Sequence, residues 1–329
     1  AVGTVAAVAQ ASDDIAVALV STEEPKVLRV GPVVDDLEVA LPPRTSNAAF
    51  GFPYEPAALS IALSDVAEDV ARPRRSGLVA FIDGSVVRLI PFALTDGRSI
   101  ELGVRPGNLW TVPSLAGTKA VVRAIPDGRG FLLAVVSPSG TPALRRIAPF
   151  DPEGIDPDNC RDEPRNETGC IAPPAGLAVE QFAAGVPATT VDLAVEVGPD
   201  GPVALLVWSS DRVLGQAFAI HPSSLTPVGG MRTFGAPATG VTTPLISTPI
   251  GVTSEGGGFV VLAENEGDTR LHRVALANPE LPIPSELLGV ERRGGALTVE
   301  NGLVSYVRLA DGSLTARRWC APKRPPGSQ

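Results

Sequence analysis

The sequence predicts an all-β protein, and three observations lead to this prediction. The chain of 329 residues is rich in Val, Ala, Gly and Pro, and turn-forming dipeptides interrupt it about every ten residues. Apolar residues alternate along many short segments, which is the period of a β-strand. A unit of strands joined by tight turns recurs from end to end, and a spacing of roughly 40–70 residues is typical of small antiparallel sheets arranged radially.

The composition favours a packed core over disorder. The 34 Gly and 33 Pro would also suit a disordered chain, but 44% of the residues are apolar and the mean hydropathy is +0.19. The net charge of −9 has the wrong sign for non-specific binding of nucleic acid. No apolar run approaches the length of a transmembrane helix, so we expect no membrane span. Arginine greatly outnumbers lysine, which indicates a GC-rich, bacterial genome.

The clearest repeat unit covers residues 190–222, where three strands are predicted. Apolar residues alternate with polar or small ones over 191–197. Residues 198–201, Gly-Pro-Asp-Gly, cannot continue the strand because Pro lacks an N–H group and Gly permits a positive φ. Residues 203–208 are almost wholly apolar, as in a strand covered on both faces. After a second turn, residues 213–220 return, so the unit is an antiparallel meander.

The units before it are read in the same way. The first unit is expected to hold strands at 4–11, 15–21 and 26–34 and a fourth from Leu37. Residues 57–71 fit both helical spacing and a strand, and a strand followed by an acidic loop is preferred because the second unit needs a strand before Leu78.

Turns define the remaining units. Asp83-Gly84 is expected to form a hairpin turn in the second unit. The third unit has turns at PDGRG and SPSGTP, the fifth has turns at 254–258 and 264–268, and the sixth covers 294–322.

The third strand of the units carries an arginine, followed by apolar positions and a proline. These arginines are Arg29, Arg88, Arg146, Arg273, and Arg317 or Arg318. In the unit at 190–222, Gln216 takes this position. A ring of arginines at similar radius would bind an acidic partner. Local pairing with an acidic neighbour, or a place on the solvated face, is the preferred interpretation.

This repeat resembles the β-propeller superfamily. The second strand recurs six times, which implies a six-bladed propeller of mostly four-stranded antiparallel blades over residues 1–322, with a disordered tail at 323–329. A ring of blades removes exposed sheet edges. The WD dipeptide, the kelch double glycine and the Asp-box are absent, so the resemblance reaches no particular family. The sixth unit shows no fourth strand after Cys320, and an N-terminal segment is expected to supply it.

The longest insertion, residues 151–176, contains two of the three cysteines. Cys160 and Cys170 lie ten positions apart in the polar loop CRDEPRNETGC, and they can form a disulfide if their Cβ atoms meet. Such a bridge would contribute roughly 2–3 kcal/mol on the chain-entropy model. It would also indicate an oxidising compartment, so we expect a secreted, periplasmic or cell-surface protein with Cys320 unpaired. Three reduced thiols in a cytosolic protein are the alternative.

The insertion also holds the candidate binding residues, which are mostly acidic. They are Asp151, Glu153, Asp156, Asp158, Asn159, Asp162 and Glu163. Calcium prefers several carboxylate and carbonyl oxygens on a flexible loop, so calcium is a second hypothesis for this segment, although the spacing does not match an EF-hand. The plainer interpretation is a solvated surface loop. Three scattered thiols and two histidines do not make a zinc site.

No catalytic motif appears in the chain. GxSxG, HExxH and the P-loop are absent, and the two histidines, His221 and His272, are expected to be structural or exposed. The leading hypothesis is a non-catalytic module that binds a protein or a glycan. The alternative is a calcium-dependent propeller hydrolase or lyase acting on sugars or lactones, with inner-strand acids such as Asp192, Glu196 or Glu300 as its catalytic residues.

The repeat itself does not require the insertion. Replacing residues 152–170 with a short linker is therefore expected to cost little stability beyond the lost disulfide, and to weaken binding to a partner.

Overall fold

The structure is a computed structural model. It describes residues 3–11, 13–21, 27–34, 38–39, 49–51, 58–66, 73–104, 109–156, 160, 170–173, 179–181, 188–209, 212–235, 251–255, 258–265, 268–275, 286–289, 294–300, 303–308 and 314–318. The chain divides into two compact units. One comprises Ala1–Val191 with Ile220–Thr226, and the other comprises Asp192–Ala219 with Pro227–Gln329.

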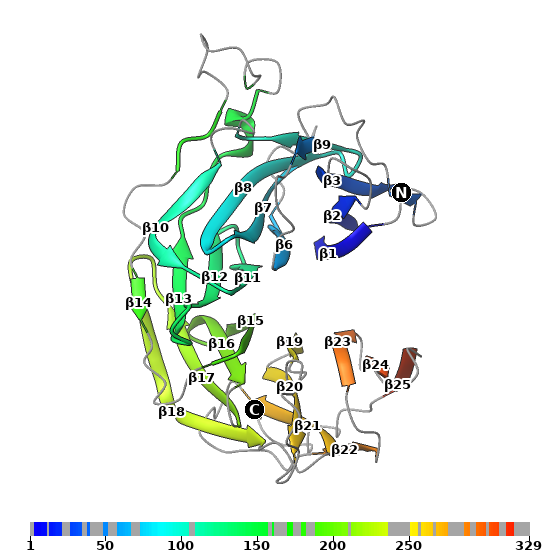
Figure 1. The fold of residues 1–329 in the computed structure, drawn as a ribbon, viewed down its shortest axis with the longest axis vertical. Coiled ribbons are helices and arrows are strands. Elements are labelled where there is room, and N and C mark those ends of the chain that lie inside the picture. The colour runs from blue at the N-terminus through cyan, green and yellow to red at the C-terminus, as the bar shows by residue number, and fades with distance from the viewer. Residues whose placement is uncertain are drawn as a thin grey trace. The chain divides into compact units, whose positions relative to one another are not determined.

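The protein is all-β, as the sequence predicts. Over the described ranges the secondary structure is made of strands and one short 3-10 helix, η1 (Pro152–Gly154), which opens the insertion. These strands form six antiparallel sheets (Figure 1). The sheets follow one another along the sequence, so each is built from one repeat unit.

The first three sheets contain the strands of the N-terminal half, drawn from blue to green in Figure 1. The first sheet has the order β1-β2-β3-β4, with β5 also pairing with β3: β1 (Gly3–Ala11), β2 (Asp14–Ser21), β3 (Val27–Val34), β4 (Glu38–Val39) and β5 (Ala49–Gly51). The second has the order β10-β8-β7-β6, with β9 pairing with β8: β6 (Leu59–Leu63), β7 (Arg74–Asp83), β8 (Val86–Thr95), β9 (Ser99–Leu102) and β10 (Trp110–Ala116). The third has the order β11-β12-β13-β14: β11 (Lys119–Ala124), β12 (Phe131–Val136), β13 (Pro142–Ile147) and β14 (Val179–Gln181).

The other three sheets follow from Thr190 onward. The fourth has the order β15-β16-β17-β18: β15 (Thr190–Gly198), β16 (Gly201–Ser209), β17 (Val213–Ile220) and β18 (Leu225–Gly235). The fifth has the order β19-β20-β21-β22: β19 (Gly251–Glu255), β20 (Gly258–Asn265), β21 (Asp268–Ala275) and β22 (Glu286–Gly289). The sixth has the order β23-β24-β25: β23 (Gly294–Glu300), β24 (Leu303–Arg308) and β25 (Leu314–Arg318).

The predicted strands agree with these sheets in type and order. The ambiguous segment after Ala57 forms β6, a strand, and Asp83-Gly84 forms the hairpin turn between β7 and β8, with Gly84 at φ +61°. The meander of the fourth sheet is confirmed, and β18 adds a fourth strand that the repeat analysis did not assign. Cys320 and the tail at 323–329 lie outside the described residues.

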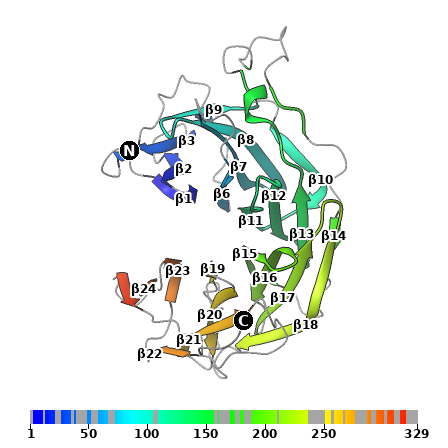
Figure 2. The ribbon, with the colours of Figure 1, turned by 180° about the vertical axis from the view of Figure 1, so that it is seen from behind.

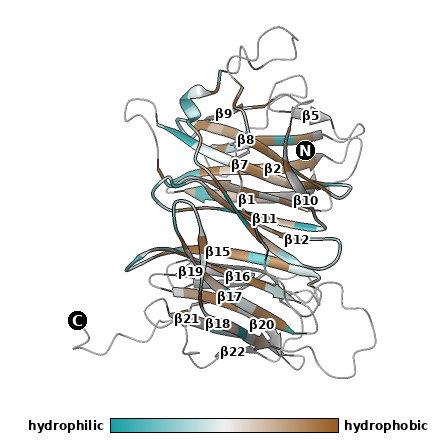
Figure 3. Cartoon of the chain, turned by 90° about the vertical axis from the view of Figure 1, so that its left-hand side faces the viewer, coloured by the Kyte–Doolittle hydropathy of each residue, from teal (hydrophilic) through white to brown (hydrophobic). Residues whose placement is uncertain are grey.

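The core of the N-terminal unit is centred on the second sheet. Residues 78–82 of β7 and all of β12 are buried, so these strands are covered on both faces. The strands β1, β6 and β11 lie side by side in Figures 1 and 2, and the Val122 N–H donates to Ser60 Oγ at 3.1 Å between β11 and β6. Apolar colour follows the central strands in Figure 3. Burial of these strands fixes the three sheets against one another.

Among the repeated arginines, Arg88 and Arg146 make local contacts. Arg88 pairs with Asp83 at 3.4 Å, and Arg146 donates to the Arg129 carbonyl at 3.0 Å. This agrees with the interpretation of local pairing for Arg88. At the equivalent position, Gln216 is 4% exposed, and its Nε2 donates to the carbonyls of Ala217, Val228 and Gly229 at 3.0, 3.1 and 3.2 Å. Gln216 therefore holds the irregular part of β18, where Gly229 has φ +67°.

Gly77 of β7 faces the ring of Phe92 across the pair β7–β8, and a Cβ at Gly77 would overlap that ring. Phe92 is fully buried and has no room to move. We predict that Gly77→Ala lowers the free energy of unfolding by about 1–3 kcal/mol, the usual cost of overpacking. Gly230→Ala is the control, because a Cβ there meets no atom within 4 Å. Chemical denaturation measures both variants, and equal losses would contradict the packing described.

Candidate functional site

The insertion docks on the second sheet through both of its ends, which we call the feet: residues 151–156 and 170–173. In the first foot, Ile155 is 2% exposed and lies against Gly103, where an added Cβ would be 3.1 Å from Ile155 Cδ1. In the second foot, the Ile171 N–H donates to the Gly103 carbonyl at 2.8 Å. The Trp110 indole N–H donates to the Ile171 carbonyl, also at 2.8 Å. Both feet therefore meet at the segment that follows β9.

The predicted disulfide is confirmed. Cys160 and Cys170 are joined, with an S–S distance of 2.07 Å and a Cα–Cα distance of 5.0 Å. Cys160 is buried, and its N–H donates to the Asp156 carbonyl at 2.8 Å. The bridge therefore starts from the docked first foot and closes on the second.

Aromatic side chains pack together next to the feet. The Trp110 and Phe150 rings meet edge to face with centroids 5.8 Å apart, and Phe131 stacks on Phe150 at 5.9 Å. Such pairs contribute about 0.5–1.5 kcal/mol beyond burial. Because Phe150 directly precedes the insertion, this cluster sets the position from which the first foot leaves β13.

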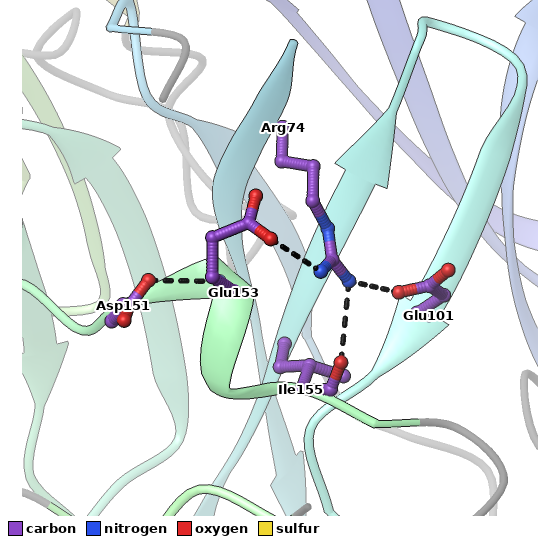
Figure 4. A network of polar contacts seen from close by, with 5 residues as sticks. All are labelled: Arg74, Glu101, Asp151, Glu153 and Ile155. Carbon is purple, nitrogen blue, oxygen red and sulfur yellow. Dashed lines mark hydrogen bonds and ion pairs between the residues drawn. The ribbon is translucent and has the colours of Figure 1, made fainter. Parts of the chain in front are cut away.

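An arginine joins the first foot to the sheet, as Figure 4 shows. The guanidinium of Arg74 at the start of β7 donates to Glu153 Oε2 at 3.1 Å, to the Ile155 carbonyl at 3.3 Å, and to Glu101 Oε2 of β9. Asp151 caps η1, because its Oδ1 accepts from the Glu153 N–H at 2.8 Å. Arg74 is thus shared between the sheet and the foot.

Glu101 is the carboxyl group most affected by this arrangement. Burial raises the pKa of Glu101, and the nearby charges of Glu153 and Asp156 raise it further, whereas the charge and hydrogen bond of Arg74 lower it. The net direction is upward, so burial and the two neighbouring carboxylates together outweigh Arg74. A raised pKa means that the ionised form of Glu101 is less favourable than that of an exposed carboxyl group. At neutral pH the ionised Glu101 therefore lowers the stability of this arrangement.

The structure places three of the seven predicted binding residues at the first foot. Asp151 caps η1, Glu153 pairs with Arg74, and Asp156 lies near Glu101. The remaining four, Asp158, Asn159, Asp162 and Glu163, lie outside the described residues. Within the ranges that the structure covers, no three His, Cys, Asp or Glu side chains come together as a metal site would require. Calcium binding stays a prediction.

The acids assigned to the enzymatic alternative do not form such a cluster over the described ranges either. Asp192 Oδ1 accepts from the Leu193 N–H at 2.8 Å, and Glu196 Oε1 accepts from the Val197 N–H at 2.9 Å, both on β15. The side chain of Glu300 lies outside the description. His221 is exposed after β17, and His272 meets Phe234 edge to face at 5.6 Å.

The residues that hold the feet were not found from the sequence. Arg74, Glu101, Gly103 and Trp110 carry no motif and lie about 40 or more positions before the feet. One signal was available: Ile155 is an apolar residue within an otherwise polar segment. Because Ile155 is buried, replacing all of 152–170 would remove part of the packed structure. The expectation that this deletion costs little therefore holds at most for residues 161–169.

None of the helical structure in the described ranges has the length and apolar character that crossing a membrane demands.

Successive small antiparallel sheets, of three to five described strands each, are typical of a β-propeller fold. The chain resembles the periplasmic gluconolactonase of Pseudomonas aeruginosa, with 12% sequence identity and a TM-score of 0.56 over 94% of this chain and 80% of that one. It also resembles a putative 6-phosphogluconolactonase from Bacteroides uniformis, with 14% identity and a TM-score of 0.48 over 90% of this chain and 78% of that one. A third match is the SapL1 lectin in complex with alpha-methyl fucoside, with 10% identity and a TM-score of 0.49 over 96% of this chain and 92% of that one. At this level of identity the first match shows a shared fold. No protein-family model and no curated protein sequence matches the chain.

We predict that Arg74→Met destabilises the protein by about 1–3 kcal/mol, because it leaves the half-buried Glu101 without its cation. The matched control is Arg88→Met. The Arg88–Asp83 pair is more exposed, with side chains at 31% and 25%, and an exposed pair contributes only about 0–1 kcal/mol. Urea denaturation measures both variants. A loss for Arg74→Met no larger than the control would show that Glu101 does not depend on Arg74 for its charge compensation.

Proposed function

We propose that this chain is a secreted β-propeller that binds another protein or a glycan without catalysis, and that residues 161–169 of the insertion make the contact. The observation that carries the proposal is the double docking of the feet. The segment starts at the buried Cys160 and returns to Ile171, which is hydrogen-bonded to Gly103. A loop whose ends are fixed loses less conformational entropy on binding than a free loop.

The chemistry of this segment suits a polar partner. Its sequence, RDEPRNETG, contains three acids and two arginines among nine residues. Arginine and carboxylate side chains form charge-assisted hydrogen bonds, which are the stronger kind. Long loops on a rigid scaffold are where binding concentrates, and the repeat does not need this one.

The disulfide supports the proposed compartment. A structural bridge between Cys160 and Cys170 persists where thiols are oxidised, which supports a secreted, periplasmic or cell-surface location. In that setting, a protein or a glycan outside the cytoplasm is the natural partner.

We also propose that the six sheets are the blades of one six-bladed ring. Each described sheet corresponds to one repeat unit. The sixth has three described strands, and a further segment would complete it. A ring of blades would leave no long exposed sheet edge.

A second candidate function is a lactonase, because the structural match with the highest TM-score among those reported is a gluconolactonase. Its support is the shared fold. The assay that separates the two candidates is hydrolysis of an aldonolactone by the purified full chain, because typical enzymes reach kcat/KM of about 10⁴ M⁻¹s⁻¹ or more.

The test of the binding proposal replaces residues 161–169 with nine Gly and Ser residues and keeps both cysteines. Ligands are first selected with the wild-type chain, either glycans on an array or extracellular protein fragments in a display library. We expect the affinity of the variant for these ligands to be at least about tenfold lower, a loss of about 1.4 kcal/mol. The melting temperature should change by no more than about 2–4 °C, because the feet remain intact. A variant with a shuffled 161–169 segment is the control for composition. Binding unchanged in both variants would place the site elsewhere, and lactone hydrolysis at enzymatic rates would favour the second candidate.

The ring is tested by small-angle X-ray scattering. A single compact body of 329 residues has a radius of gyration of about 20 Å from the usual size scaling. We predict a value near this. A clearly larger radius with a bimodal distance distribution would show two separate bodies and would contradict the ring.

A further inference from the structure

Glu101 lies at the docked first foot, near one cation and two other carboxyl groups. The charged groups acting on Glu101 are Arg74 from β7, and Glu153 and Asp156 from the insertion. The strand β8, which pairs with β9, places the apolar Ala93 opposite Glu101. Arg74 is 13% exposed and Glu101 24% exposed, so water screens the cluster only partly. Among the charged groups that act on Glu101, carboxyl groups therefore outnumber cations by two to one.

Docking itself supplies part of this excess. Glu153 and Asp156 belong to the insertion, whereas Glu101 and Arg74 belong to the sheet. When the foot docks, it brings two carboxylates towards Glu101 and takes part of the Arg74 guanidinium for Glu153. Both changes favour the neutral form of Glu101 in the docked state.

We propose that docking of the insertion on the second sheet is coupled to protonation of Glu101, so that the feet are held more tightly in mildly acidic conditions than at neutral pH. A proton on one Glu101 oxygen leaves the other oxygen as an acceptor for Arg74. Of the two carboxyl groups to which Arg74 donates, Glu153 alone then carries a full negative charge.

The sign follows from linkage. Since Glu153 and Asp156 raise the pKa of Glu101 only when the foot lies against the sheet, the docked state binds the proton more tightly than an undocked one. The contribution of Glu101 to docking is therefore fully present below the ordinary pKa of about 4.3, and it is lost as the pH rises through the docked pKa. Each pKa unit that separates the two states changes the docking equilibrium about tenfold.

The coupling holds whatever the loop binds, because it concerns the docking alone. Its effect on recognition rests on the proposed function: a partner that needs residues 161–169 held in place would bind better at lower pH. The experiment therefore measures docking directly, so that a failure of the coupling and a failure of the binding proposal remain distinguishable.

The test is amide hydrogen exchange on the full chain between about pH 5 and about pH 8, corrected for intrinsic exchange rates. The reporter is the Ile171 N–H, which bonds to Gly103 only when the insertion is docked, and Leu133 in the buried β12 is the reference. We expect the opening constant at Ile171 to fall from about pH 8 to about pH 5, by up to about tenfold for each unit by which docking raises the pKa of Glu101. Glu101→Gln, which cannot ionise, should remove this dependence and keep the low-pH value throughout. Asp83→Asn, at a comparable arginine-paired acid, should leave the dependence unchanged.

Two results would overturn the coupling. One is an opening constant at Ile171 in the wild-type chain that is flat or rises on acidification relative to Leu133. The other is a Glu101→Gln variant that keeps the wild-type slope. The wild-type profile alone decides the sign, so the proposal stays testable if Glu101→Gln unfolds. In that case, a carbon-13 NMR titration of the Glu101 carboxyl group gives its pKa directly, and a pKa at or below the ordinary value would also overturn the coupling.

Discussion

The burial of the second sheet on both faces is the constraint on which the rest of the N-terminal unit depends. Its strand β6 lies between β1 and β11, and residues 78–82 of β7 are covered completely. Gly77 is required there because the Phe92 ring fills the space of its side chain. A sheet held this firmly can anchor an added segment at the end of β9. There Gly103 lies against Ile155 of the first foot and accepts a hydrogen bond from Ile171 of the second. The same packing holds both feet of the insertion.

Apolar burial and backbone hydrogen bonds hold the feet more strongly than the ion pairs do. Full burial of a side chain such as Ile155 contributes about 1.5–3 kcal/mol, whereas a partly exposed pair such as Arg74–Glu153 contributes about 0–1 kcal/mol. Arg74 still matters, because its loss would leave Glu101 desolvated. We infer that packing sets the stability of the docked insertion, while the charges set its dependence on pH.

The sequence was sufficient for the strands but not for the site. Alternation and turn residues mark β15 to β17 because strand periodicity is a local signal. The strand β18 was missed because Pro227 and two glycines interrupt its pattern, and a buried Gln216 from the neighbouring strand satisfies its carbonyls instead. The acidity of the insertion and its disulfide were also local features. Its docking was not predictable, because Gly103 and Trp110 come near the feet only through the tertiary fold.

A double-mutant cycle between Gly103 and Ile155 tests the docking most directly. Gly103→Ala places a methyl group 3.1 Å from Ile155 Cδ1, which is too close, and Ile155→Val removes that atom. The account predicts that the double variant is more stable than the sum of the single changes implies, with a coupling of about 0.5–3 kcal/mol in the free energy of unfolding. Additivity within about 0.3–0.5 kcal/mol would show that the two residues do not touch, and that the insertion is not docked on this sheet.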